Sequence, residues 1–181
     1  MRLGAESDRI HAAGAEVIAI SVDDEQRQAG MFERWPTPNV LYVSDPGGER
    51  YLLPLGLFDP EERGGIGRPG MIVLAPDGAE VYRYDGRDFA DRTTDAEVYA
   101  ALDGLDLDPI EPPPGGPFGE VPGDLRGFFR PDHLVPYFKG NRFGAVAIAG
   151  RTEDRTFRAI AREHRVMADE TLAAWDRVRA R

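Results

Sequence analysis

The side chains that most often carry out chemistry are few and scattered in this sequence. Its 181 residues include no cysteine, which excludes a thiol nucleophile, a disulfide and a thiolate metal site within them. The three histidines, His11, His133 and His164, lie far apart, and no carboxylate or second histidine stands at metal-ligand spacing from any of them. We therefore expect no metal site, no cofactor and no catalytic residue among these groups.

The acidic and glycine-rich clusters have structural explanations. Asp23-Asp24-Glu25 could bind a cation, but capping of the following helix is the interpretation we favour. The segments 59–62 and 85–88 combine aspartate with proline or glycine, as solvated turns do. The glycines within 63–67 have neither the lysine nor the preceding strand of a phosphate-binding loop.

The overall charge narrows the choice of partners. Twenty-two Lys and Arg stand against thirty-two Asp and Glu, which gives a net charge of −10. Such a surface repels phosphate groups, so neither nucleic acid nor a membrane is an expected partner. The chain is 41% hydrophobic and has no signal-like segment and no apolar run of membrane-spanning length. We expect a soluble protein in the cytoplasm.

The charge is divided unevenly along the chain. Residues 1–105 contain ten basic and twenty acidic residues, whereas residues 106–181 contain twelve of each. Proline and glycine also become dense just after this boundary. We therefore predict a first domain at 1–105, a Pro/Gly-rich linker at 106–127 and a mostly helical C-terminal extension at 128–181.

Hydrophobic periodicity predicts an α/β fold for the first domain. Short apolar runs rich in β-branched residues indicate strands buried on both faces, and amphipathic stretches between a capping residue and a glycine indicate helices. Two strands joined by one helix predict a parallel βαβ unit, and Pro76-Asp77-Gly78 predicts a hairpin. The predicted order is helix 2–13 ended by Gly14, strand 16–22, helix 23–34 capped by Asp23 and Gln26, strand 40–43, turn 45–48, a short helix at 51–58, strand 71–74, strand 80–84, and a helix from Thr94 to Leu102.

The extension contains the clearest helix, residues 152–179. Glu153 and Asp154 stand at its start and Arg177 and Arg179 at its end, as the helix dipole favours. Residues 143–149 could form a strand, but their alternating alanines favour a helix. One apolar stripe on the long helix could dock a protein partner or a second copy, or it could pack on its own domain. The stripe consists of Phe157, Ile160, His164, Met167, Leu172 and Trp175, with Val178 at its end.

Three segments of the first domain, taken in order, resemble the thioredoxin-like superfamily. More narrowly, they resemble the redoxin or alkyl hydroperoxide reductase/thiol-specific antioxidant group of peroxiredoxin relatives. The segments are Gly14 to Asp23, Val43 to Pro46, and Pro69 with Ile72 to Gly78. The resemblance covers residues 1 to about 105. It implies a mixed sheet flanked by helices and an antioxidant thiol oxidoreductase by descent.

The resemblance makes Arg68, Pro69 and Gly70 active-site-like. It implies a cis peptide bond before Pro69, although X–Pro bonds in general are mostly trans, and with the family context we expect cis. Arg68 would stabilise a thiolate and polarise a peroxide, or else pair with an acidic neighbour on the surface. Because Pro69 stands where many peroxiredoxins place that arginine, disulfide chemistry is implied more than peroxidase chemistry.

The same resemblance places the reactive cysteine a few residues before Met1, and it places the family's earlier strands, including the central strand of the sheet, upstream as well. Either the sequence begins too late or the chain is a true remnant. Residues 143–149, a partner chain, or closure of the two halves of the sheet could fill the gap. We therefore expect either a redoxin-type enzyme whose cysteine lies outside these residues, or a non-catalytic module that docks a partner or a second copy through its C-terminal helix. Without a cysteine, the chain itself is predicted to be inactive in thiol chemistry.

Overall fold

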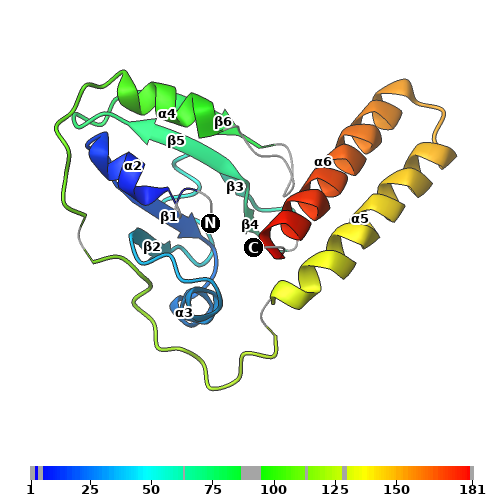
Figure 1. Ribbon diagram of the computed structural model, residues 1–181, viewed down its shortest axis with the longest axis horizontal. Helices are drawn as coiled ribbons and strands as arrows, with labels where there is room; N and C mark the ends of the chain where they lie inside the picture. Colours follow the sequence, from blue (N-terminus) through cyan, green and yellow to red (C-terminus); the bar gives the residue numbers. More distant parts are fainter. Residues whose placement is uncertain are drawn as a thin grey trace. The chain divides into compact units, whose positions relative to one another are not determined.

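The chain folds as two compact units, Met1–Phe128 (unit 1) and Phe129–Arg181 (unit 2), in the computed structural model (Figure 1). The structure describes residues 3, 6–62, 64–86, 95–112, 114–127 and 130–179. Unit 1 combines helices with short strands and unit 2 is a pair of helices, so the predicted α/β class is confirmed. The predicted capping residue Thr94 and the side chain of Val178 lie outside what is described.

A parallel βαβ unit forms the first part of unit 1, as predicted. β1 (Val17–Ser21) pairs in parallel with β2 (Val40–Ser44), and α3 (Glu25–Arg34) connects them. The helix is capped by Asp24, whose carboxylate accepts a hydrogen bond from the backbone N–H of Arg27 at 2.8 Å. The prediction that Asp23 caps this helix is therefore wrong, because the helix begins one residue later than the spacing suggested.

One face of β1 is more exposed than predicted. Val17 packs against the core cluster of unit 1, whereas Ile18, on the opposite face of the strand, is 57% exposed. The prediction of a strand buried on both faces is therefore wrong for β1. A continuous apolar run reports residue types, and burial also requires a second layer to cover the other face.

The segment after β2 is a loop organised by Asp45. The backbone N–H groups of Arg50, Tyr51 and Leu52 donate to its buried carboxylate at 3.1, 2.9 and 2.8 Å. The prediction of a short helix at 51–58 is wrong, because a side chain supplies the acceptors that a helix takes from its own backbone. The loop leads into β3 (Phe58–Asp59), which pairs antiparallel with β4 (Ile66–Gly67).

The predicted hairpin and the helices around it enclose the main core. β5 (Gly70–Leu74) and β6 (Glu80–Asp85) pair antiparallel across a turn in which Gly78 has φ +86°. The two other helices of the unit are α2 (Ser7–Ala12), followed by Gly14 with φ +76°, and α4 (Asp95–Asp103). The buried cluster consists of Ile10, Val73, Val98, Tyr99 and Leu102.

The described strands form three separate two-stranded sheets. The pairs are β1–β2, β3–β4 and β5–β6, and no ladder connects these pairs within the described ranges. Residues 143–149 belong to a helix, so the hypothesis that they fill a gap between strands is wrong. Their alanines favour helix, and the segment continues a helical turn pattern on both sides.

The described part of the Pro/Gly-rich segment 106–127 packs on the rest of unit 1 instead of standing free. The backbone N–H groups of Gly115 and Gly116 donate to the carbonyls of Pro38 and Val40 at 3.0 and 2.8 Å. Further along, Arg34 of α3 donates from Nη2 to a carbonyl of this segment at 3.2 Å. We call residues 114–127 the strap, because they run along β2 and α3.

Unit 2 is an antiparallel helical hairpin. α5 (Pro131–Arg151) is joined to α6 (Arg155–Arg179) by a short turn. Asp154 ends this turn, and its carboxylate accepts from the N–H groups of Thr156 and Phe157 at 2.7 and 3.3 Å. The long predicted helix is thus confirmed from Arg155 onward, and the acidic residue that precedes it serves as its cap.

Candidate functional site

The three active-site-like residues support the backbone around β5. The side chain of Arg68 donates to the carbonyl of Gly56, and its backbone N–H donates to the carbonyl of Leu57 at 2.7 Å. A Cβ atom at Gly70 would lie 2.5 Å from a methyl carbon of Leu57, so a larger residue there requires the Leu57 side chain to move. The structure therefore brings Arg68, Pro69 and Gly70 together at the start of one strand, with Arg68 bound to a loop carbonyl.

The peptide bond before Pro69 is trans. No cis bond occurs in the described part of the chain, so the expectation of a cis proline is wrong. The carbonyl of Pro69 accepts a hydrogen bond from the N–H of Gly86 at 2.7 Å. This bond extends the β5–β6 ladder by one pair, and a trans bond keeps the chain extended as the ladder requires.

A buried contact between His11 and Glu16 was missed by the sequence analysis. His11 Nε2 lies 3.3 Å from Glu16 Oε1, which also accepts from the backbone N–H of Val17 at 2.9 Å. The left-handed backbone of Gly14 reverses the chain between α2 and β1 and brings the two side chains together. No group of three or more metal-ligand side chains occurs within the ranges that the structure describes.

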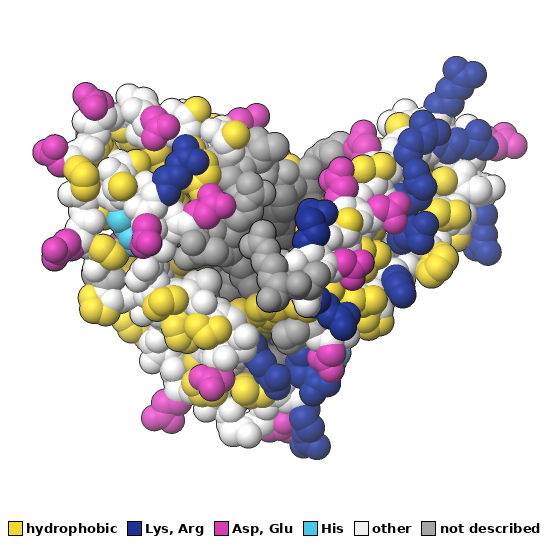
Figure 2. All heavy atoms as spheres, viewed as in Figure 1, with side chains coloured by type: hydrophobic (Ala, Val, Ile, Leu, Met, Phe, Trp, Pro, Cys, Tyr) yellow, Lys and Arg dark blue, Asp and Glu magenta, His cyan; other side chains and the backbone are white. Residues whose placement is uncertain are grey.

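The two units carry opposite net charges. Unit 1 contains eleven basic and twenty-five acidic residues, a balance of −14, and unit 2 contains eleven basic and seven acidic residues, a balance of +4. Figure 2 shows Lys and Arg side chains along the hairpin and mostly acidic ones on the visible face of unit 1. The sequence analysis missed this basic unit because its boundary at residue 106 grouped the acidic linker with the hairpin.

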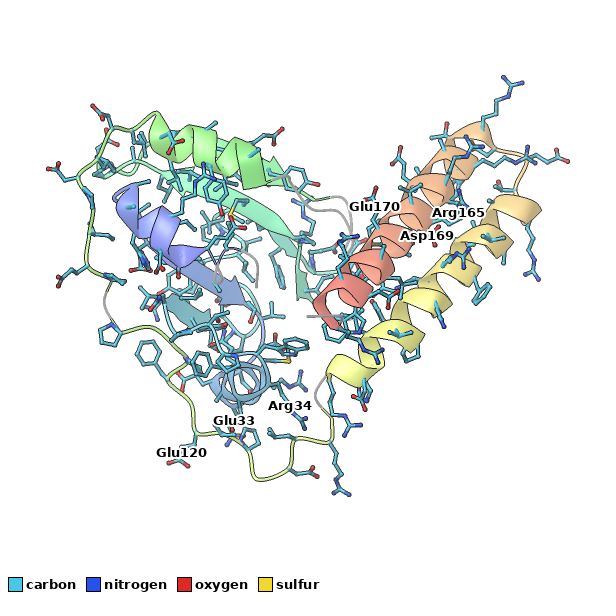
Figure 3. The ribbon with its side chains drawn as sticks, in the orientation of Figure 1. Glu33, Arg34, Glu120, Arg165, Asp169 and Glu170 are labelled. Carbon is cyan, nitrogen blue, oxygen red and sulfur yellow. The ribbon has the colours of Figure 1, made fainter. Side chains whose placement is uncertain are left out.

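The hairpin helices pack through small side chains. Ala145 of α5 and Ala161 and Ala168 of α6 are buried between them. An ion pair of 2.9 Å between Arg142 Nε and Asp169 Oδ1 also joins the two helices. Figure 3 labels Asp169 on α6. Small side chains let the backbones approach, so the relative position of α5 and α6 is well defined.

A cleft of about 360 Å³ lies between α5 and α6, which we call the arginine cleft. Arg158, Arg162 and Arg165 stand at positions i, i+4 and i+7 of α6, so their side chains share one stripe of the helix. The remaining lining is apolar and small. It consists of Ala145, Val146, Ala149 and Ala161.

The charges of the arginine cleft are largely uncompensated. Arg158 Nε donates to the carbonyl of Thr152 at 2.8 Å, whereas Arg162 and Arg165 form no hydrogen bond or ion pair with any residue that the structure describes. No carboxylate lines the cleft. Three like charges on one stripe repel one another, so the cleft favours an anion. The sequence signal for this site was the i, i+4, i+7 spacing of the arginines.

The predicted apolar stripe lies on another flank of α6. Phe157, Ile160, His164 and Met167 follow helical spacing, and this face is turned away from the arginines. Phe157 is 57% exposed and Ile160 is 44% exposed, while His164 and Met167 are half-buried. The half-buried Leu172 falls in the row of Ala161 and Ala168, and the half-buried Trp175 follows one turn later on α6.

One residue of α5 extends this flank. Ile148 is 53% exposed, and helical periodicity places it on the opposite flank of α5 from Val146 and Arg142. Because the two helices are antiparallel, this flank of α5 lies beside the apolar stripe of α6. We call these residues the apolar side of the hairpin: Ile148, Phe157, Ile160, His164 and Met167.

Comparisons with protein-family models, with curated proteins and with solved structures find no match. Among the helices in the described ranges, none combines the length and the apolar character needed to cross a membrane.

Proposed function

We propose that this chain is a non-catalytic assembly module of the cytoplasm, and that the apolar side of its hairpin docks on the same side of a second copy. One observation carries the proposal. Ile148, Phe157 and Ile160 are 53%, 57% and 44% exposed on one side of a two-helix unit. Fully burying a side chain of this size contributes roughly 1.5–3 kcal/mol. Two hairpins packed as a four-helix bundle would bury all three residues of both copies.

The absence of ionic side chains favours a second copy as the partner. None of the five residues of the apolar side is Asp, Glu, Lys or Arg. In a two-fold contact the patch of one copy meets the same patch of the other copy. A patch with charges of one sign would therefore face like charges, whereas an uncharged patch meets no such repulsion. A partner recognised by charge would contact the arginine cleft on the other flank instead.

The non-catalytic part of the proposal rests on the cysteine-free sequence, because thiol exchange and peroxide reduction by a redoxin need a thiolate. We propose in addition that unit 1 is a thioredoxin-like domain of redoxin descent that serves as a scaffold. The order of a parallel βαβ unit, a β-hairpin and a helix supports this proposal. The engagement of Arg68 with a loop carbonyl is consistent with a scaffold role.

Self-association of the full chain tests the proposed assembly. Sedimentation equilibrium is expected to show a dimer for the unsubstituted chain. Replacement of Phe157 and Ile160 together by Glu places four carboxylates in the contact of the dimer. The dissociation constant is expected to rise at least about tenfold, which corresponds to about 1.4 kcal/mol.

Phe143→Glu is the matched control for this experiment. Phe143 is 65% exposed and lies on the outer face of α5, away from the row of Ala145. The same aromatic-to-acid change there is expected to leave the dimer intact, and circular dichroism checks that all variants keep their helices. A monomeric unsubstituted chain, or a dimer that survives the double substitution, would contradict the proposal.

A further inference from the structure

We infer that the arginine cleft binds an amphiphilic anion, a molecule with a phosphate or carboxylate headgroup and a short alkyl segment. The cleft lies between α5 and α6, and its arginines occupy a different flank of α6 from the apolar side. The inference is therefore independent of the proposed dimer, and each can fail without the other.

The headgroup is recognised by the guanidinium groups. Arg162 and Arg165 have no hydrogen-bond or ion-pair partner among the described residues, and Arg158 commits only its Nε to a carbonyl. Each guanidinium presents a planar fork of donors that matches the oxygen spacing of a carboxylate or a phosphate. Arg165 is half-buried, which strengthens its interaction with an anion by reducing the screening from water.

The alkyl segment is recognised by the apolar lining. Ala145 and Ala161 form the buried floor, and Val146 and Ala149 of α5 form a wall. No hydrogen-bonding side chain other than the arginines lines the cleft, so a sugar or a peptide backbone would lose its bonds to water there without replacement. The volume of about 360 Å³ lies at the lower end of the range of small-molecule sites, which fits a headgroup with a short chain.

The cleft is held open by the packing of the hairpin. The ion pair between Arg142 and Asp169 joins α5 to α6 one helical turn beyond Arg165 (Figure 3). It also occupies the carboxylate of Asp169, which would otherwise compete with a ligand for Arg165. The backbone positions of the arginines are thus fixed before any ligand arrives, which lowers the entropy cost of binding.

Isothermal titration of the full chain with octyl phosphate, below its micelle concentration, tests this inference. We expect saturable binding at one site per chain. Replacing Arg162 and Arg165 together by Gln is expected to weaken binding about tenfold or more, since two charge-assisted bonds are lost. Replacing Arg177 and Arg179 by Gln removes the same charge from the last turn of α6, outside the cleft, and is expected to leave binding unchanged.

Two further ligands separate the contribution of the headgroup from that of the alkyl segment. Inorganic phosphate and 1-octanol are each expected to bind at least about tenfold more weakly than octyl phosphate, because each satisfies half of the site. Val146→Thr is expected to weaken the binding of octyl phosphate and to leave the binding of inorganic phosphate unchanged. The inference would be overturned if inorganic phosphate bound as tightly as octyl phosphate. It would also be overturned if the Arg162/Arg165 and Arg177/Arg179 double-glutamine variants lost equal affinity for octyl phosphate.

Vesicles identify the source of the anion. If vesicles of an anionic phospholipid bind the chain and octyl phosphate competes with them, the cleft accepts a lipid headgroup, and the inference holds. If they do not bind but octyl phosphate does, the ligand is a free amphiphile, and the inference also holds. Vesicle binding without saturable binding of octyl phosphate would show a diffuse basic surface and overturn the inference. The Arg162/Arg165 variant is expected to remain a dimer in sedimentation equilibrium, because its apolar side is unchanged. This measurement keeps the test of the cleft separate from the test of the proposed assembly.

Discussion

The side chain of Asp45 organises the start of the loop after β2, although the sequence suggested only an ordinary turn at this position. Its side chain is 3% exposed and accepts three backbone N–H groups. Burial alone raises the pKa of this carboxyl, but the N–H donors of Leu52, Tyr51 and Arg50 and the nearby charge of Arg50 outweigh burial and hold the pKa below its ordinary value. The loop conformation therefore depends on an ionised aspartate.

The substitution Asp45→Asn is expected to lower the free energy of unfolding by about 1–3 kcal/mol. The amide keeps one acceptor oxygen and places an NH2 group against donors that the carboxylate had satisfied. Urea unfolding measures the loss. Asp59→Asn is the control. Asp59, at the end of β3, accepts its two N–H groups from Glu61 and Glu62 in hydrogen bonds exposed to solvent, so this substitution should change stability by less than about 1 kcal/mol. Equal effects of the two substitutions would argue against a special role for Asp45.

The effect of Asp45 also has a pH dependence of defined sign. Because the folded state lowers the pKa of this carboxyl, its contribution is complete above the unfolded pKa, near 3.9, and is lost as the pH falls through the lower folded value. The difference in unfolding free energy between the unsubstituted chain and Asp45→Asn should thus be constant near neutral pH and shrink below about pH 4. A difference that grows on acidification would contradict this account.

The strap is the element whose position depends most on glycine. A Cβ atom at Gly119 would lie 2.3 Å from the backbone oxygen of Glu25, and backbone atoms at the start of α3 cannot move aside easily. Arg34, at the other end of α3, binds the strap through a carbonyl (Figure 3). The strap and α3 are therefore in close backbone contact.

Gly119→Ala is expected to release the strap from α3. Amide exchange and limited proteolysis should both become faster within residues 114–127, because the alanine methyl group cannot be accommodated against the backbone. Gly123→Ala is the matched control, since nothing lies within 4 Å of a Cβ atom at that position. If the two variants are cleaved at the same rate, the strap does not depend on this close contact.

At the scale of the whole molecule, the division into two units predicts separate responses to substitution. Ala168 is fully buried in the hairpin, so Ala168→Leu inserts a larger side chain into a close helix–helix contact, at a cost of about 1–3 kcal/mol. Hydrogen exchange should accelerate in α5 and α6 and stay unchanged in the β1–β2 and β5–β6 pairs of unit 1. Ala173→Leu, at an exposed position of α6, should change neither the stability of the hairpin nor the hydrogen exchange of α5 and α6. Acceleration across both units would show that they unfold as one.

The sequence by itself determined the α/β class, the β1–β2 and β5–β6 pairs and most of α2, α3, α4 and α6, because these depend on local periodicity and turn chemistry. The hairpin at Gly78 and the end of α2 at Gly14 were predictable for the same reason. Only the tertiary structure decided the loop at Asp45, the path of the strap along β2 and the two flanks of unit 2. The strap and the two flanks depend on contacts between residues distant in the chain, such as Gly116 with Val40 and Arg142 with Asp169. The loop depends on the burial of Asp45 against the backbone N–H groups of residues 50–52, which local periodicity does not report. The arginine cleft exists only when α5 packs on α6, since its charges lie on α6 and most of its apolar lining lies on α5.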